Sequence, residues 1–337
     1  MELLSPASGF ARVVSTIEYR RDPLTGCWCR INVSRAQRVR QSRGDGADAA
    51  QAIEGTKDGC YFCPEHLDAA TAKFPPEFAD AARIHEGDTV VFPNLYPFAE
   101  YHAVAVLTRQ HCLRLDEFTP VMIQDNIAAT QRYIAAVNRW DVRAKYPVWL
   151  WNHLPPSGAS IIHPHVQITV DRSPMSGLRD MFNASRRYHR KNGRVFWADL
   201  IDAERQEGQR FIADYGSLAV IASFAPRGNR ELQIVFKDVS SLIDLERRQV
   251  ADFADAVVRA LRCYKSMGVD SFNIITYSGP VGGNDGHFWM SARLIARPGF
   301  QPYYTSDSGT LERFYGTFVI ETLPEAVARE MKGYYRF

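Results

Sequence analysis

Two histidines and a glutamine occupy alternate positions in the segment His163-Pro-His165-Val-Gln167. Residues two apart in a β-strand lie on the same face, so the spacing predicts that these three side chains share one surface of a sheet. A neutral imidazole has a pKa of about 6.5 and is nucleophilic near neutral pH, and an amide N–H can stabilise an oxyanion. The pattern favours a polar site in which one histidine is held by a metal or a hydrogen bond while the other is free as base or nucleophile. Two half-buried core histidines are the alternative interpretation.

A second group of chemically active residues is the pair Cys60-x-x-Cys63. Two thiolates at this spacing can bind one tetrahedral metal ion. A redox-active pair and a merely buried pair are equally open on the spacing alone. The pair therefore predicts a metal site only if further ligands come from elsewhere in the chain.

The elements that must position these residues can be predicted from periodicity and turn residues. A buried strand over 148–151, a turn rich in Pro, Ser and Gly, and a second strand over 161–170 carry the histidines. Paired strands over 90–93 and 102–107 precede them, followed by a helix that starts at Thr119-Pro120 and has one apolar face. The same order returns later as strands 217–222 and 231–236, a helix over 244–267, and strands 272–277 and 287–296. Two similar halves at an offset of about 124 residues predict an antiparallel sheet with helices packed on one face.

The N-terminal region is predicted to be less regular. Strands over 11–18 and 27–33 around the turn Asp22-Pro-Leu-Thr-Gly26 read as a hairpin, and residues 39–58 read as a mobile loop because they contain almost no large apolar residues.

Bulk composition excludes several classes of protein. The 337 residues are 46% hydrophobic and 23% charged, which is ordinary for a globular protein. A net charge of +2 argues against nucleic-acid binding as the main activity, and no apolar run approaches the roughly 20 residues of a membrane helix. Six cysteines, two of them as a Cys-x-x-Cys pair, favour a reduced cytoplasm over a disulfide framework.

Several motifs together carry a family resemblance. Asn152, Gly158, Ser160 and the His163–Gln167 segment resemble the active-site segment of galactose-1-phosphate uridylyltransferases, a branch of the histidine-triad superfamily. The resemblance extends in order over Arg20–Arg38, Gly59–Pro64 and Phe92–Pro97, which match the N-terminal segment, the metal-binding cysteine pair and the base-binding strand end of that family. It implies an α+β fold of two tandem histidine-triad-like halves, a catalytic one over 1–180 and a degenerate one over 181–337. It also implies a homodimer in which each site is completed by the neighbouring chain.

The resemblance assigns roles to individual residues. It implies a structural zinc ion bound by Cys60, Cys63, His111 and His163, although His111 on its own reads equally as a helix-entry cap or a surface residue. Further assignments are His165 as nucleophile, Gln167 and Ser160 as stabilisers of phosphoryl oxygens, Arg35 and Arg38 as phosphate contacts, Asn94 as a nucleobase contact, and Asn152 and Gly158 as substrate-binding residues. The implied reaction transfers an NMP group from a nucleotide or nucleotide sugar to a phosphate-bearing acceptor through a nucleotidyl-histidine intermediate.

Three departures from the family pattern bear on the substrate. Leu154 follows Asn152-His153 where the family has Asn-x-Gly, Val166 replaces a glycine, and the segment 314–325 lacks the family's Gly-x-Glu…Gln pattern. In the late strand where the family has a His-x-His for a second metal, only His287 is nearby, so a second metal site is not predicted. Galactose 1-phosphate is therefore not the first expected acceptor. The alternatives are a phosphorylase or hydrolase of ADP-sugars or dinucleoside polyphosphates and, from another class, a non-catalytic nucleotide-binding protein.

Overall fold

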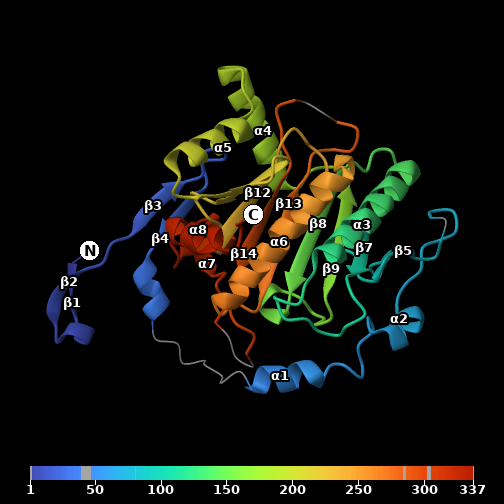
Figure 1. Ribbon diagram of the computed structural model, residues 1–337, viewed down its shortest axis with the longest axis horizontal. Helices are drawn as coiled ribbons and strands as arrows, with labels where there is room; N and C mark the ends of the chain where they lie inside the picture. The colour runs from blue at the N-terminus through green and yellow to red at the C-terminus, as the bar shows by residue number, and fades with distance from the viewer. Residues whose placement is uncertain (1, 39–46, 80, 284–285, 302–304, 337) are drawn as a thin grey trace.

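The structure, a computed structural model, describes residues 2–38, 47–79, 81–283, 286–301 and 305–336. Its centre is one ten-stranded antiparallel sheet with the strand order β10-β11-β12-β14-β13-β8-β9-β7-β6-β5 (Figure 1). The first half of the chain provides β5 (Ile84–Glu86), β6 (Thr89–Pro93), β7 (Tyr101–Val106), β8 (Tyr146–His153) and β9 (His165–Asp171). The second half provides β10 (Phe211–Asp214), β11 (Leu218–Ala222), β12 (Asn229–Phe236), β13 (Phe272–Tyr277) and β14 (Ser291–Ala296).

The two sets of five strands have the same internal order, β8-β9-β7-β6-β5 and β13-β14-β12-β11-β10. They join along β8 and β13, where Asn152 lies opposite Asn273. Each set is accompanied by one long helix, α3 (Pro120–Trp140) or α6 (Arg247–Ser266), and the two helices contact each other. The predicted α+β fold with two similar halves and an antiparallel sheet is confirmed.

The main core lies between the sheet and the two long helices. The apolar positions predicted for the first helix are all fully buried in it: Ile123, Ile127, Ile134 and Val137. Those of the second helix are buried in the same core: Val250, Phe253, Val257, Leu261 and Tyr264. Burial stabilises the fold by roughly 1.5–3 kcal/mol for each large aliphatic side chain. The helix face of the sheet is thus committed to packing, and polar chemistry is left to the other face.

Helix starts follow the capping residues in the sequence. Thr119 is the N-cap of α3 and Pro120 its first residue, as predicted, because a proline at this position loses no helical hydrogen bond. The predicted start of the second helix at residue 244 is three residues early. Residues 242–244 form the short 3₁₀ helix η4, and α6 begins after a capping box formed by Glu246 and Gln249.

The opposite face of the sheet is covered by different elements in the two halves. Over the first half, Phe62 and, in α2 (Pro64–Ala70), Leu67 pack on Phe92, Val104 and Val106. Two further helices cover the second half. Helices α4 (Ser176–Asn192) and α5 (Phe196–Glu207) pack there, with Trp197 buried against Ala219 of β11 and Val235 of β12. Helix α8 (Pro324–Lys332) instead joins the main core beside α6.

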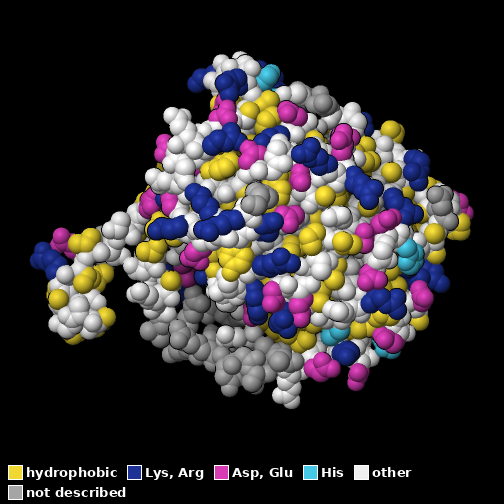
Figure 2. Space-filling model, in the orientation of Figure 1, with side chains coloured by type: hydrophobic (Ala, Val, Ile, Leu, Met, Phe, Trp, Pro, Cys, Tyr) yellow, Lys and Arg dark blue, Asp and Glu magenta, His cyan; other side chains and the backbone are white. Residues whose placement is uncertain are grey.

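Figure 2 shows the face of α3 and α6, on which basic and acidic side chains are interspersed. No helix in the described part of the chain is long and apolar enough to cross a membrane.

The N-terminal strands pair differently from the prediction. The strand expected over 11–18 is two strands: β2 (Ala11–Val14) pairs with β1 (Glu2–Ser5), whereas β3 (Glu18–Arg21) pairs with β4 (Trp28–Ile31). The β1–β2 hairpin projects from the body of the molecule (Figure 1). β15 (Phe318–Ile320) adds to β4 in parallel, and this contact buries Ile31 and Ile320 together. The separate partners of β2 and β3 explain why one continuous strand does not form.

The loop expected over 39–58 is only partly tested. Residues 39–46 lie outside the described residues, and Ala47–Glu54 form helix α1, which corrects the prediction for that stretch. Four of these eight residues are alanine, the strongest helix former, and helix formation does not require large apolar side chains. The other short helices are η1 (Pro6–Ser8), η2 (Val33–Gln37), α2 (Pro64–Ala70), η3 (Pro155–Ser157) and α7 (Thr310–Tyr315).

Candidate active site and metal centre

Strand β9 presents its polar residues on the face of the sheet opposite α3 and α6. Val166, Ile168 and Val170 are fully buried in the main core, so His165 and Gln167 project from the other side, as predicted from the alternation. The strand begins at His165 rather than at residue 161. Pro164 immediately before it has no N–H for a sheet ladder.

His165 is held in one orientation by its own strand. Its Nδ1 lies 2.8 Å from the carbonyl oxygen of His163, and because a carbonyl only accepts, Nδ1 carries the proton. The Nε2 lone pair is then available for attack. Burial lowers the pKa of His165, so the ring is neutral at physiological pH. The ring of Phe62 lies edge-on at 5.2 Å and supplies an apolar wall beside it.

Gln167 is oriented by a histidine from the neighbouring strand. His102 of β7 is buried, and its Nδ1 accepts the backbone N–H of Phe98 at 3.3 Å. Its proton therefore lies on Nε2, which donates to Gln167 Oε1 at 2.9 Å. Burial lowers the pKa of His102 and favours this neutral form. The carbonyl of the Gln167 amide is thus occupied, and its N–H₂ group remains to donate to an anion.

His102 was not singled out by sequence reasoning. Its position on β7 could have indicated its role. His102 lies on the same face of the sheet as Val104 and Val106, and these two residues pair with Gln167 and His165 of β9. Asn94 belongs to the same group, with Nδ2 3.2 Å from His102 Nε2 and Oδ1 accepting the N–H of Tyr96 at 2.9 Å. Asn94 and Gln167 therefore both lie next to His102 Nε2. Because this nitrogen carries the proton that it donates to Gln167, its contact with the Asn94 amide nitrogen is not a hydrogen bond.

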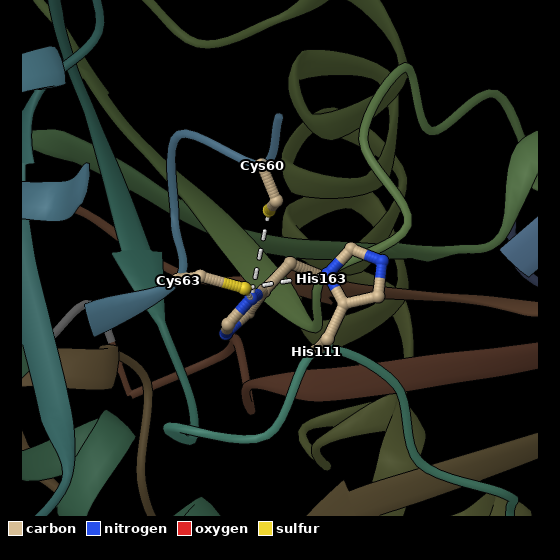
Figure 3. A group of neighbouring side chains, drawn as sticks. All are labelled: Cys60, Cys63, His111 and His163. Carbon is tan, nitrogen blue, oxygen red and sulfur yellow. Dashed lines mark hydrogen bonds between the residues drawn. The ribbon is translucent and has the colours of Figure 1, made fainter. Parts of the chain in front are cut away.

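The four predicted metal ligands converge from three segments of the chain (Figure 3). Cys60 and Cys63 precede α2, His111 follows β7, and His163 precedes β9; all four are buried, and their ligand atoms lie within 4.8 Å of one another. The sulfur-to-Nδ1 distances are 3.7 Å from Cys60 to His163, 3.6 Å from Cys63 to His163 and 3.5 Å from Cys63 to His111. Zinc bonds of about 2.3 Å to sulfur and 2.0–2.1 Å to nitrogen give a tetrahedral edge of roughly 3.5–3.6 Å. The cluster can therefore bind a tetrahedral metal ion.

The second nitrogen of each histidine in the cluster is already engaged. His163 Nε2 donates to the carbonyl oxygen of Thr108 at 2.7 Å, and His111 Nε2 lies 3.0 Å from the hydroxyl of Thr56. This leaves both Nδ1 atoms to face the sulfurs, as in metal sites where an outer hydrogen bond fixes the tautomer. Burial lowers the pKa of His163 to about 4, so it is a neutral ligand. Burial, together with Cys60, raises the pKa of the Cys63 thiol to about 12, so a metal must displace its proton.

No model of a known protein family matches the chain. The chain is 27% identical over 319 residues to an uncharacterized protein from Archaeoglobus fulgidus, covering 94% of this chain and 92% of that one. An ADP-glucose phosphorylase from Arabidopsis thaliana, solved with bound ADP-glucose, superposes with a TM-score of 0.73 at 18% identity over 94% of this chain and 99% of that one. A uridylyltransferase structure superposes with a TM-score of 0.67 at 21% identity over 94% and 98% of the two chains.

The chain has the uridylyltransferase fold. At these identities the two structures establish the fold alone, and they confirm at that level the resemblance found in the sequence.

Asn152 is the second-last residue of β8, and Gly158 and Ser160 lie in the loop that joins β8 to β9. Gly158 ends the 3₁₀ helix η3 with φ 97°, a conformation that favours glycine, and Ser160 is exposed. Leu154, where the family has glycine, also adopts a positive φ of 67° with ψ 159°. The leucine side chain is buried, so packing holds the backbone in the path that glycine would take without strain.

Arg35 and Arg38 lie in the N-terminal part of the chain, before α1. Both belong to the segment of η2, next to the small sheet of β3, β4 and β15, and Arg38 pairs with Glu321.

The second half of the uridylyltransferase fold has a filled surface where the first half has its site. Ser291 and Arg293 project from the same sheet face as His165 and Gln167, because Ala292 and Leu294 are buried in the main core. Arg293 is buried there and pairs with Glu231 at 2.6 Å and with Asp22 at 3.4 Å. The ion pairs of Arg293 and the packing of α4 and α5 fill this face, so we assign its polar residues a structural role.

Replacing Arg293 by methionine is expected to destabilise the protein by roughly 3–5 kcal/mol, because the substitution leaves the fully buried Glu231 carboxylate without its cation. The free energy of unfolding in urea measures this loss. Adding Glu231→Gln to Arg293→Met is expected to restore part of the stability, since the uncompensated charge is then removed. A loss below about 1 kcal/mol for the single variant would contradict the assignment.

Proposed function

We propose that the protein is a nucleotidyltransferase that forms a nucleotidyl-histidine intermediate at His165. The observation that carries the proposal is the buried, neutral His165, whose Nδ1 is fixed by the His163 carbonyl so that Nε2 is the reactive atom. In the first step the Nε2 lone pair forms a bond to the α-phosphorus of a nucleotide donor. The bond from that phosphorus to the bridging oxygen breaks, and the leaving phosphate or sugar phosphate departs with the electron pair. In the second step an oxygen of a phosphate-bearing acceptor attacks the same phosphorus, and the electron pair of the P–N bond returns to Nε2.

Charge stabilisation in both steps is proposed to come from neutral donors. The Gln167 amide, with its carbonyl held by His102, presents N–H groups on the face of His165. Asn152, Ser160 and the backbone at Gly158 supply further donors from the end of β8 and the loop that joins it to β9. Phosphoryl transfer depends mainly on such positioning and on stabilisation of the oxygens that surround phosphorus.

The nucleobase is proposed to lie against the apolar patch next to His165. Phe62, Phe92, Val104 and Val106 form a buried cluster on this face, and Phe62 and Val106 border a cavity of about 280 Å³. Val106 lies directly opposite His165 in the sheet, which puts the apolar patch beside the reactive nitrogen. Asn94 at the end of β6 is the proposed polar contact to the base.

The metal is proposed to be zinc with a structural role. Two cysteines and two histidines form a closed tetrahedral set with no carboxylate ligand, which is the ligand chemistry that zinc prefers in structural sites. Zinc bound at His163 would fix the start of β9 and so the position of His165 two residues later.

The test of the proposal is a search for the covalent intermediate. The purified protein is incubated with UDP-glucose, ADP-glucose, a dinucleoside polyphosphate or single NTPs, and intact mass is measured for an added NMP. We expect an adduct with at least one donor and its discharge by a phosphate-bearing acceptor. ADP-glucose is included because a phosphorylase of this nucleotide sugar has the same fold. Binding of donors without adduct or turnover would overturn the proposal in favour of a nucleotide-binding protein.

His102 is expected to support the reaction through Gln167. His102→Phe keeps the ring but removes the donor to Gln167 Oε1, so the rate of adduct formation is expected to fall roughly 10–100-fold, less than the full loss of an oxyanion donor. Thr169→Val is the matched control, since Thr169 is buried directly opposite His102 and its hydroxyl has no hydrogen-bond partner among the described residues. Equal rates in the two variants would contradict this role of His102.

A homodimer is proposed as the working form. The proposal rests on the family resemblance, in which the neighbouring chain completes each site. Arg35 and Arg38 lie at η2, where Arg38 pairs with Glu321, and are the residues proposed to contact phosphate there. Light scattering at micromolar concentration is expected to give twice the mass of one chain. A monomeric mass would remove the proposed contact across the subunit boundary.

A further inference from the structure

The Asn273 amide of the second half contacts both the end of β8 and the loop that follows it. β13 pairs with β8 so that Asn273 lies directly opposite Asn152. Asn273 Nδ2 lies 2.5 Å from Asn152 Oδ1 and 2.9 Å from the carbonyl oxygen of Ser157. Asn273 therefore hydrogen-bonds both to the side chain of Asn152 in β8 and to the backbone of η3 in the loop that follows.

The direction of these hydrogen bonds is determined by an arginine. Arg297 Nη1 lies 2.6 Å from Asn273 Oδ1, and a guanidinium can only donate, so this atom of Asn273 is the carbonyl oxygen. The other end of Asn273 is then the N–H₂ group, whose partner on Asn152 must be an oxygen. Asn152 therefore has its carbonyl occupied and its N–H₂ group left to donate.

Arg297 is itself held in place by a carboxylate. Asp307 accepts from Arg297 Nε at 3.1 Å and from Nη2 at 2.7 Å, a two-pronged contact that fixes the plane of the guanidinium. A series of hydrogen bonds with fixed donors and acceptors thus runs from Asp307 through Arg297 and Asn273 to the carbonyl oxygen of the Asn152 side chain. Gln167 is set in the same sense by His102, so both amides of the site present donors rather than acceptors.

We propose that Asn273 and Arg297 are positioning residues for transfer at His165: they turn the Asn152 amide so that its N–H₂ group donates to the phosphoryl oxygens, and they fix the turn at Ser157 next to it. The proposal rests on the proposed function of the site. It gives the second half a direct part in the reaction, although that half has neither the nucleophile nor the metal ligands.

The test inverts the polarity at Asn273 without changing its shape. Asn273→Asp still accepts from Arg297 but can no longer donate to Asn152, so Asn152 is expected to turn its N–H₂ group away from the substrate. The single-turnover rate of adduct formation is expected to fall roughly 10–100-fold, with the melting temperature kept close to that of the wild type. Asn229→Asp is the matched control: it makes the same change in the same half, and Asn229 Oδ1 only accepts the N–H of Glu321, which a carboxylate also does.

A double-mutant cycle separates positioning from a simple effect of charge. In an Asn152→Ala background, Asn273→Asp is expected to cause a smaller further loss than in the wild type, because only its contact with the Ser157 carbonyl then remains to be lost. Replacement of Arg297 gives a second readout: Arg297→Lys keeps a donor for Asn273 and is expected to retain more activity than Arg297→Met.

The possible outcomes are distinct. Equal rates for Asn273→Asp and Asn229→Asp would overturn the positioning role. An equally large effect of Asn273→Asp with and without Asn152 would overturn the proposed action through the Asn152 amide. A wild-type protein that forms no adduct with any donor would instead overturn the proposed function, before either variant is compared.

Discussion

Replacing His165 by alanine is expected to reduce nucleotidyl transfer by three or more orders of magnitude while leaving the fold and the metal content unchanged. The loss of a covalent nucleophile removes both steps of the reaction, and the remaining donors can stabilise phosphoryl oxygens but cannot form the intermediate. The metal is expected to stay because its ligand is His163, whose side chain contacts the cysteines rather than His165. Steady-state turnover, circular dichroism and elemental analysis of the same preparation measure the three quantities.

A chemical rescue distinguishes a nucleophile from a general base. With His165→Gly and an added nucleotide phosphoimidazolide, the small molecule supplies the missing intermediate, so the second half of the reaction is expected to return. Recovery with this reagent and none with the ordinary donor would identify the intermediate as a phosphoramidate. A rate for His165→Ala above about one hundredth of wild type would instead show that double displacement through this residue is wrong.

The site residues that could be predicted from sequence are those whose spacing carries the signal. The alternation in the His163–Gln167 segment placed His165 and Gln167 on the polar face, and the apolar residues between them are fully buried. The spacing of the cysteine pair permitted a metal site without establishing it, and His111 and His163 entered the ligand set only through the family resemblance. Local period and short motifs are sufficient where the interacting residues are neighbours on one element.

The partners that could not be predicted come from other strands. His102 is 65 residues from Gln167 and Asn273 is 121 residues from Asn152, so their contacts depend on the strand order and register of the assembled sheet. A polar residue on a half-buried strand carries no mark of which neighbour it will meet. The same reason accounts for the divided N-terminal strand, since a run of strand-forming residues does not show that β2 and β3 pair with different partners.

Loss of the metal is expected to have the largest effect on stability. His163→Ala removes one ligand and leaves Cys60, Cys63 and His111, an incomplete set in which the hydrogen bond to Thr108 is also lost. We expect the free energy of unfolding to fall by at least about 3 kcal/mol, because structural zinc contributes roughly 10–16 kcal/mol of apparent binding energy in small metal-dependent domains. Denaturant titration with zinc analysis before and after dialysis against a chelator measures the effect.

A nearby histidine outside the cluster provides the control for the metal prediction. His66 lies on α2, three residues after Cys63, and its exposed ring contacts only the Asp58 carbonyl among the described residues, so His66→Ala is expected to keep both zinc and stability.

Wild-type protein should lose zinc as the pH falls, because protons compete with the metal for a buried thiol whose metal-free pKa is raised to about 12. Wild-type protein purified without zinc or iron, or equal stability of His163→Ala and His66→Ala, would contradict a structural metal. If zinc and stability are lost together in His163→Ala, its transfer activity should fall as well, because the metal site and His165 share the start of β9.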